Sequence, residues 1–311
     1  MFQLDIFSFG QYTARRYYTE DNSISFTIIP ECGALLNDYQ FNGHPIIDGC
    51  KTPREVESNN WCKSWLLFPF PNRLKDGRYT WQDNTYQFPI NETQNQHALH
   101  GFLHECAFVL VEEAVTATQV VLRLQYEYAG KRVYYPFPFL FEIGITADTQ
   151  GRFRMEATIT NCGTQEMPMG FGWHPYFQLG GKINDWQLKT SPIELIGIDQ
   201  RMIPTGKKYD YDTYANFKTI KSEVLDNCFE GRGKFGKNTE VQLTDGRLRL
   251  TVSQPTIQFP YLQLFTPPSR QSIAIEPMTC NVDAFNNGDR VIELKPKESW
   301  WGTYFFKIAS V

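Results

Sequence analysis

Apolar side chains recur at every second position along much of this chain. They do so in residues 120–128, 141–145 and 153–159, where most of the intervening positions are polar. A period of two predicts strands that have one face on a core and the other in water. No long segment has a period of 3.6, and strands do not alternate with helices. The pattern therefore predicts an all-β fold with antiparallel sheets and only short helices in the connections.

Turn dipeptides separate these segments and predict where the chain reverses. They are Asp76-Gly77, Asp83-Asn84, Asp245-Gly246 and Asn287-Gly288. The run from Val241 to Val252, VQLTDGRLRLTV, predicts a hairpin centred on Asp245-Gly246. Strand spacing continues from Ile24 to Ile308 without a linker, a repeat or a low-complexity run. We therefore expect one large sandwich domain over residues 1–311.

Composition and charge exclude several classes of function. The chain has 311 residues, 15% of them aromatic, and a formal net charge of −4. This charge predicts no nucleic-acid partner and no anionic membrane partner. The start of the chain does not resemble a signal peptide, and no segment is long enough to span a bilayer. The seven cysteines form no CxxC pair, which favours buried free thiols in a reducing, cytoplasmic setting.

The segment GFGWHPYF, from Gly170 to Phe177, holds His174 among aromatic residues with no charged neighbour. Pro175 biases His174 toward an extended backbone. An imidazole in this setting can act as an acid near neutral pH, or it can be a histidine of the core. The segment alone leaves both interpretations open.

Three of the five histidines lie in HALHGFLHE, namely His97, His100 and His104. Gly101 interrupts helical continuity, which argues against a metal site built from all three. We expect one histidine to work at a strand end while the other two are structural or solvated. His100 is the candidate, because a following glycine lets a ligand approach the backbone closely.

Two further segments carry polar residues next to apolar runs. In LFPFPNRLKDGRY, Asn72 and Arg73 are expected in a loop, where Arg73 can bind hydroxyls or instead pair with Asp76 at the surface. In IAIEPMTCNVDAF, Glu276 is expected to end an apolar strand, with Pro277 stopping the ladder. Partial burial there would raise its pKa toward the range of a general base. An ordinary exposed carboxylate is the alternative for Glu276 and for Asp226 in VLDNCF.

Together these segments resemble the aldose 1-epimerase (galactose mutarotase) family over nearly the whole chain. The similarity rests on the order and spacing of FPNRLKDGRY, HALHGF, GFGWHPYF and YLQLFTP followed by IAIEPMTCNVDAF. The resemblance implies an antiparallel β-supersandwich. It assigns Glu276 as the catalytic base, His174 as the catalytic acid and His100 as the second histidine of the site. It also assigns sugar contacts, to Asn72, Arg73, Asp226 and Gln263.

The resemblance implies a mutarotase that opens and closes the ring of a free aldohexose without a metal or other cofactor. We expect Glu276 and His174 to meet across a shallow groove, on opposite sides of the sugar, in a monomer or homodimer. Two departures from the family affect the pocket: Phe102 follows Gly101 where many members have a second glycine, and the connection from Gln263 to Glu276 is short.

Three other functions stay open on the sequence. A related branch of the family acts on hexose 6-phosphates, but the segment before Asn72 has Lys63 and no arginine cluster. A glycosidase would use Glu276 and Asp226 as its two carboxylates and would leave the histidines without a role. A non-catalytic sugar-binding protein or sensor of the same fold is the third alternative.

Overall fold

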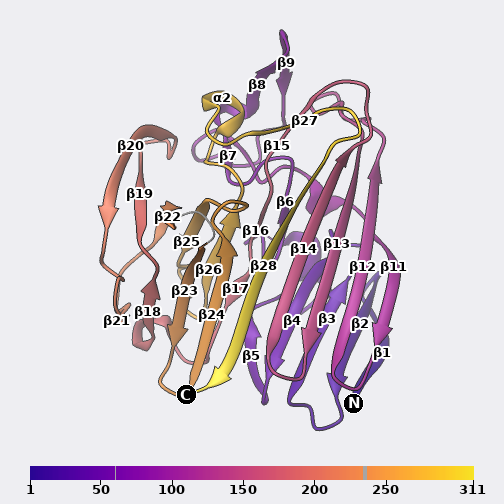
Figure 1. Ribbon diagram of the computed structural model, residues 1–311, viewed down its shortest axis with the longest axis vertical. Coiled ribbons are helices and arrows are strands. Elements are labelled where there is room, and N and C mark those ends of the chain that lie inside the picture. The colour runs from indigo at the N-terminus through magenta and orange to yellow at the C-terminus, as the bar shows by residue number, and fades with distance from the viewer. Residues whose placement is uncertain (60, 234–236) are drawn as a thin grey trace.

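Two large antiparallel sheets form most of the computed structural model, which describes residues 1–59, 61–233 and 237–311 (Figure 1). The first has thirteen strands, of which eleven follow one another in the order β1 (Phe2–Phe9), β2 (Tyr12–Thr19), β3 (Ile24–Ile29), β4 (Leu35–Phe41), β5 (His44–Ile47), β17 (Tyr176–Phe177), β26 (Ile273–Met278), β25 (Tyr261–Phe265), β22 (Asp226–Gly231), β19 (Ile193–Ile198) and β20 (Pro204–Tyr211). The two-residue strand β16 (Gly172–Trp173) also pairs with β26, and β6 (Leu66–Leu67) pairs with β16.

The second sheet has nine strands. Their order is β11 (Val109–Val115), β12 (Gln119–Tyr128), β13 (Phe139–Asp148), β14 (Arg152–Asn161), β28 (Ser299–Ser310), β24 (Leu248–Pro255), β23 (Asn238–Thr244), β18 (Gln187–Thr190) and β21 (Lys218–Thr219). Three small ladders join β7 (Arg73–Leu74) to β10 (Ala98–Leu99), β8 (Arg78–Trp81) to β9 (Asn84–Gln87), and β15 (Met167–Met169) to β27 (Ile292–Leu294). The helices are short: α1 (Pro53–Ser58), α2 (Ala284–Asn287) and the 3₁₀ turns η1 (Lys75–Gly77), η2 (Leu103–Glu105) and η3 (Ile183–Asp185).

The core lies between the two sheets, where their alternating apolar faces meet. Every second residue of β13 is buried, as the sequence predicts. Phe153 of β14 stacks on Phe306 of β28 at 4.7 Å, and Tyr39 of β4 meets Phe306 edge-on at 5.0 Å. Aromatic rings from both sheets thus interlock, which gives close packing and a large buried apolar area. The predicted antiparallel all-β fold is confirmed.

The predicted turns have two outcomes. The hairpin around Asp245-Gly246 is confirmed, with Val241 opposite Val252 in the β23–β24 ladder. Asn287-Gly288 does not join two strands: it ends helix α2, and Gly288 takes a positive φ of +73° at the cap. Both positions favour glycine, because glycine adopts a positive φ without a steric cost.

All seven cysteines are free thiols, but not all of them are buried as expected. Cys162 is exposed, because it follows the last residue of β14 in a surface turn. Among the described residues, the helices are too short and too polar for any of them to cross a bilayer.

Candidate active site

All seven residues that the sequence singles out line one cavity of about 170 Å³. The chain brings them from six separate places, and the consecutive strands β26, β25 and β22 supply three of them. The full lining is Trp61, Cys62, Asn72, Arg73, Leu99, His100, His174, Tyr176, Asp226, Gln263, Phe265 and Glu276. Imidazoles, carboxylates and a guanidinium converge there beside aromatic rings, which is the composition of a polar ligand site rather than of a core.

His174 sits in a break between β16 and β17, two short strands that both pair with β26. Its backbone is held on both sides: its N–H donates to the Trp65 carbonyl at 3.0 Å, and its carbonyl accepts from the Ser64 N–H at 2.8 Å. The Tyr176 ring stacks on the imidazole at 5.0 Å. These contacts fix the ring beside the middle of β26, where Glu276 lies.

Glu276 lies inside β26 rather than at its end, so the expectation that Pro277 stops the ladder is wrong. Pairing with β25 continues through Leu262 opposite Pro277 to Tyr261 opposite Met278. On the other edge of β26, the Ile275 N–H donates to the carbonyl of Pro175, within the β16–β17 break, and the Thr279 N–H donates to that of Phe171, just before β16. Pro277 shares their side and faces that break, so no backbone donor is required of it.

The carboxylate of Glu276 and the imidazole of His174 are in direct contact. Nε2 of His174 is 3.3 Å from Oε1 of Glu276, and the two side chains are 8% and 2% exposed. They therefore line the cavity side by side, not on opposite sides of a void as expected. The reason is topological, because β16 and β17 border the same strand that carries Glu276.

Burial acts on this pair in opposite directions. It raises the pKa of Glu276 well above its usual value, and the nearby Asp226 raises it further while Arg73 lowers it. Burial lowers the pKa of His174 to about 3, partly offset by its own backbone carbonyl. Both shifts favour the uncharged form of each group, so the resting pair is a protonated Glu276 beside a neutral His174, with one proton between them.

His100 and Asn72 hold each other through a reciprocal pair of hydrogen bonds. The Asn72 N–H donates to Nδ1 of His100 at 3.1 Å, and the His100 N–H donates to the Asn72 carbonyl at 2.9 Å. Because Nδ1 is an acceptor, the proton of the neutral ring is on Nε2. Burial and the neighbouring His174 and Arg73 hold the pKa of His100 well below its usual range. His100 is thus a neutral hydrogen-bond donor.

Gly101 serves a purpose other than the one expected from the sequence. It has a φ of +67°, and a Cβ there would stand 2.0 Å from the Phe68 carbonyl oxygen. The glycine lets two backbone segments pack against each other, as the Phe68–Gly101 bridge requires. It positions His100 and does not open room for a ligand.

Asp226 and Gln263 form the wall next to Glu276. Nε2 of Gln263 donates to Oδ1 of Asp226 at 2.8 Å, across the ladder of β22 and β25. Burial raises the pKa of Asp226, and Arg73 counteracts this as an opposite charge. Gln263 fixes one carboxylate oxygen and leaves the other for a ligand.

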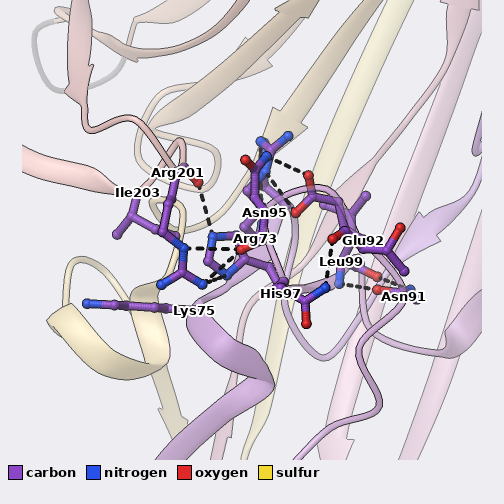
Figure 2. Close-up of polar contacts among 12 residues, drawn as sticks. Arg73, Lys75, Asn91, Glu92, Asn95, His97, Leu99, Arg201 and Ile203 are labelled. Atoms are coloured by element: carbon purple, nitrogen blue, oxygen red, sulfur yellow. Dashed lines mark hydrogen bonds and ion pairs between the residues drawn. The ribbon is translucent and has the colours of Figure 1, made fainter.

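Arg73 is oriented by a polar network that includes Glu92 and Asn95 (Figure 2), and not by Asp76. Its Nη1 donates to Oδ1 of Asn72 at 3.2 Å, and its Nε is 3.8 Å from Oε2 of Glu92. Asn95 donates to the other oxygen of Glu92 at 2.7 Å. Asp76 instead pairs with Arg201 at 2.5 Å. The surface-pairing alternative for Arg73 is therefore wrong.

The other two histidines of HALHGFLHE are structural. His97 is fully buried: Nδ1 accepts from the Asp76 N–H at 3.0 Å, and Nε2 contacts the Arg201 carbonyl at 3.0 Å (Figure 2). The His104 ring stacks on Trp65 at 3.5 Å. Within the described ranges, no group of three or more histidine, cysteine or acidic side chains is placed to hold a metal ion.

Sequence reasoning missed five lining residues, namely Trp61, Cys62, Leu99, Tyr176 and Phe265. Leu99, Tyr176 and Phe265 lie inside the motifs HALHGF, GFGWHPYF and YLQLFTP, whereas Trp61 and Cys62 lie outside every such motif. Trp61 is 48% exposed and stacks on Phe265 at 6.3 Å. Nothing in its neighbourhood of the sequence marks it as part of the cavity.

Comparison with known proteins places these features in a family. The family model described as aldose 1-epimerase matches residues 17–307. The Escherichia coli K12 protein YihR is 27% identical over 281 residues, which cover 88% of this chain and 87% of that protein. Among solved structures, a galactose mutarotase-like protein from Clostridium acetobutylicum superposes with a TM-score of 0.87 at 20% identity, covering 100% of this chain and 99% of that one. Galactose 1-epimerase from Lactobacillus acidophilus gives 0.83 at 14% identity, with coverage of 100% and 99%. At these identities the solved structures show the shared fold.

Proposed function

This chain belongs to the aldose 1-epimerase family, and on that premise we propose that it interconverts the α and β anomers of a free aldohexose. The observation that carries the proposal is the buried contact of 3.3 Å between His174 and Glu276 in a cavity that Arg73, His100 and Asp226 also line. A paired acid and base, with hydrogen-bonding groups around them, suit a reaction that only moves protons on one sugar ring.

In the proposed mechanism, Glu276 takes the proton of the anomeric hydroxyl while His174 protonates the ring oxygen. The bond between the anomeric carbon and the ring oxygen breaks, and an open-chain aldehyde forms. Rotation of the carbonyl exposes its other face, and the ring closes with the two proton transfers reversed. The productive form of the pair has its single proton on His174. Arg73 favours this form because it lowers the pKa of Glu276.

The remaining residues are proposed to hold the sugar while the anomeric centre turns. The Nε2–H of His100 and the guanidinium of Arg73 are donors, and Asp226 supplies a carboxylate oxygen as acceptor. Asn72 and Gln263 act mainly by fixing Arg73, His100 and Asp226 through the hydrogen bonds described above. Since each group is held before a ligand arrives, little ordering is required on binding.

Polarimetry of freshly dissolved α-glucose and α-galactose tests the proposal directly. Glu276→Gln keeps the shape of the side chain and removes the base, so kcat should fall by about 10²-fold or more while sugar binding persists. His174→Asn should cause a comparable loss. Glu20→Gln, at an exposed position, is the control. Full activity of Glu276→Gln would remove Glu276 from the mechanism.

The same preparation tests two of the three other functions that the sequence leaves open. A glycosidase would release reducing sugar from an aryl glycoside, which we do not expect because Glu276 is paired with an imidazole. A sensor would bind an aldohexose without accelerating its mutarotation. Turnover in the polarimeter excludes that alternative, and its absence at saturating protein would establish it.

A further inference from the structure

A second hollow of about 250 Å³ adjoins the cavity of the active site. Trp61 and Tyr176 line both spaces, so they stand at the junction. The far wall is the connection between β25 and β26, which contributes Ser269, Gln271 and Ser272. It belongs to the segment from Gln263 to Glu276 that is short in this sequence. The proposed reaction at Glu276 does not use the hollow.

The charged groups of the hollow are already paired with one another. Oδ1 of Asp48 accepts from Nζ of Lys63 at 3.0 Å, and Oδ2 accepts from the Ser272 hydroxyl at 2.8 Å. Lys63 also donates to the Gly49 carbonyl at 3.2 Å. Among the charged side chains that line the hollow, only Lys51 has no close partner: its side chain is 64% exposed, and its Nζ is 4.0 Å from Oδ1 of Asp48. An exposed lysine next to a carboxylate binds an anion only weakly.

What the hollow does offer is an aromatic face beside hydroxyl and amide groups. Trp61 is 48% exposed, while Ser269 and Gln271 are exposed on the opposite wall. An aromatic face suits the apolar face of a sugar ring, and the polar groups suit its hydroxyl rim. A neutral, hydroxyl-bearing unit therefore fits the hollow better than a phosphate or sulfonate.

We propose that the hollow is a second sugar subsite, and that the protein accepts reducing disaccharides whose second, neutral unit rests on Trp61. This inference rests on the proposed function. It adds a substrate class to the same site, with the reducing unit held between Glu276, His174 and Arg73.

The position of the hollow also selects a linkage. Tyr176 stacks on His174 and borders the hollow. In the proposed mechanism His174 protonates the ring oxygen, so the hollow lies on the ring-oxygen side of the bound sugar. The carbons next to that oxygen are C1 and C5. C1 must keep a free hydroxyl toward Glu276, so the branch that enters the hollow is the one on C5. The second unit is therefore attached through C6.

Isomaltose and maltose provide a matched test, since both consist of two α-linked glucose units and differ only in a 1→6 or 1→4 linkage. Anomer exchange at equilibrium is measured by NMR for each disaccharide and for glucose. We expect kcat/KM for isomaltose to exceed that for maltose by about tenfold, the effect of one or two additional contacts. If galactose is the accepted unit, the 1→6 and 1→4 galactobioses replace them.

Two variants connect the preference to the hollow. Gln271→Ala removes a polar group and should lower kcat/KM for isomaltose about fivefold with glucose unchanged. Gln150→Ala, at an exposed turn elsewhere, should change neither. Ser269→Trp fills the hollow and should abolish the preference for isomaltose even if Gln271 contributes little.

The outcomes separate this inference from the function beneath it. If the protein turns over no aldohexose, the proposed function itself is wrong. Turnover of glucose with isomaltose no better than maltose, or an unchanged preference in Ser269→Trp, would overturn the subsite alone. A higher kcat/KM for glucose 6-phosphate than for isomaltose would overturn its neutral character.

Discussion

His174 and Glu276 are two ionisable side chains that share one proton, and this determines how activity should depend on pH. Burial lowers the pKa of His174 to about 3 and raises that of Glu276 well above its usual value. The pair gains a second proton only as the pH falls toward the lowered pKa of His174. It loses its single proton only above the usual range of a carboxyl group.

We therefore predict that kcat/KM has no acid limb near pH 6.5, where a free imidazole titrates, and falls on the acid side only as the pH approaches the lowered pKa of His174. The measurement is anomer exchange by NMR at each pH, after subtraction of the buffer-catalysed rate. An acid limb centred near pH 6.5 would contradict this prediction, because it would mean that His174 titrates as it does in water.

The connection between β10 and η2 shows how a short element positions a catalytic-site side chain. Within it, His100 and Gly101 have positive φ of +66° and +67°, and Asn72, the hydrogen-bond partner of His100 just before β7, has a φ of +61°. This conformation is uncommon for residues other than glycine. It turns the imidazole of His100 toward Asn72, where the reciprocal hydrogen bonds form. The strain is located where the site needs a particular orientation.

Gly101→Ala tests this element. The new Cβ would be 2.0 Å from the Phe68 carbonyl oxygen, so the cost of positive φ and that of a backbone collision add together. We expect the free energy of unfolding to fall by about 3 kcal/mol, measured by urea denaturation. Sugar affinity should also fall, because His100 moves with the displaced backbone.

Gly43→Ala is the matched control for Gly101→Ala. Gly43 has a φ of +75° but meets nothing within 4 Å, so only the conformational cost remains. A loss of about 1 kcal/mol is expected there. Equal losses at the two positions would show that the contact with Phe68 is not what requires glycine at 101.

For the molecule as a whole, the period of two was sufficient to predict the antiparallel sheets and the β23–β24 hairpin, which the structure confirms. The convergence of the seven polar residues was expected only from their match to family motifs. Local sequence alone left His174, Arg73 and Glu276 each with a structural alternative.

What sequence could not predict depends on contacts between distant segments. Glu276 and His174 lie side by side because β16 and β17 both border β26, and no local pattern encodes that neighbour relation. The local sequence predicts that Pro277 ends a strand, but Pro277 lies within β26 and faces the break between β16 and β17. Trp61 becomes part of the cavity only because β25 brings Phe265 beside it.

The stability of the whole fold should depend on pH through His104. Its ring is 12% exposed and stacks on Trp65. Burial, with a smaller contribution from Arg132, lowers its pKa to about 3. Glu105 is 3.8 Å away, but its charge is engaged by Arg132 at 2.9 Å. Below pH 6.5 the unfolded chain binds a proton at this histidine that the folded chain does not, so acid favours unfolding.

His104→Phe retains a flat ring against Trp65 and removes the titration. Between pH 7 and pH 5, we expect the free energy of unfolding of the parent protein to fall by about 2 kcal/mol more than that of the variant. Nδ1 of His104 has no partner among the described residues, so the substitution breaks no hydrogen bond at that atom. Urea denaturation at both pH values measures the difference. Parallel pH dependences would show that His104 is protonated as readily in the fold as in the unfolded chain, and would refute its burial as a neutral ring.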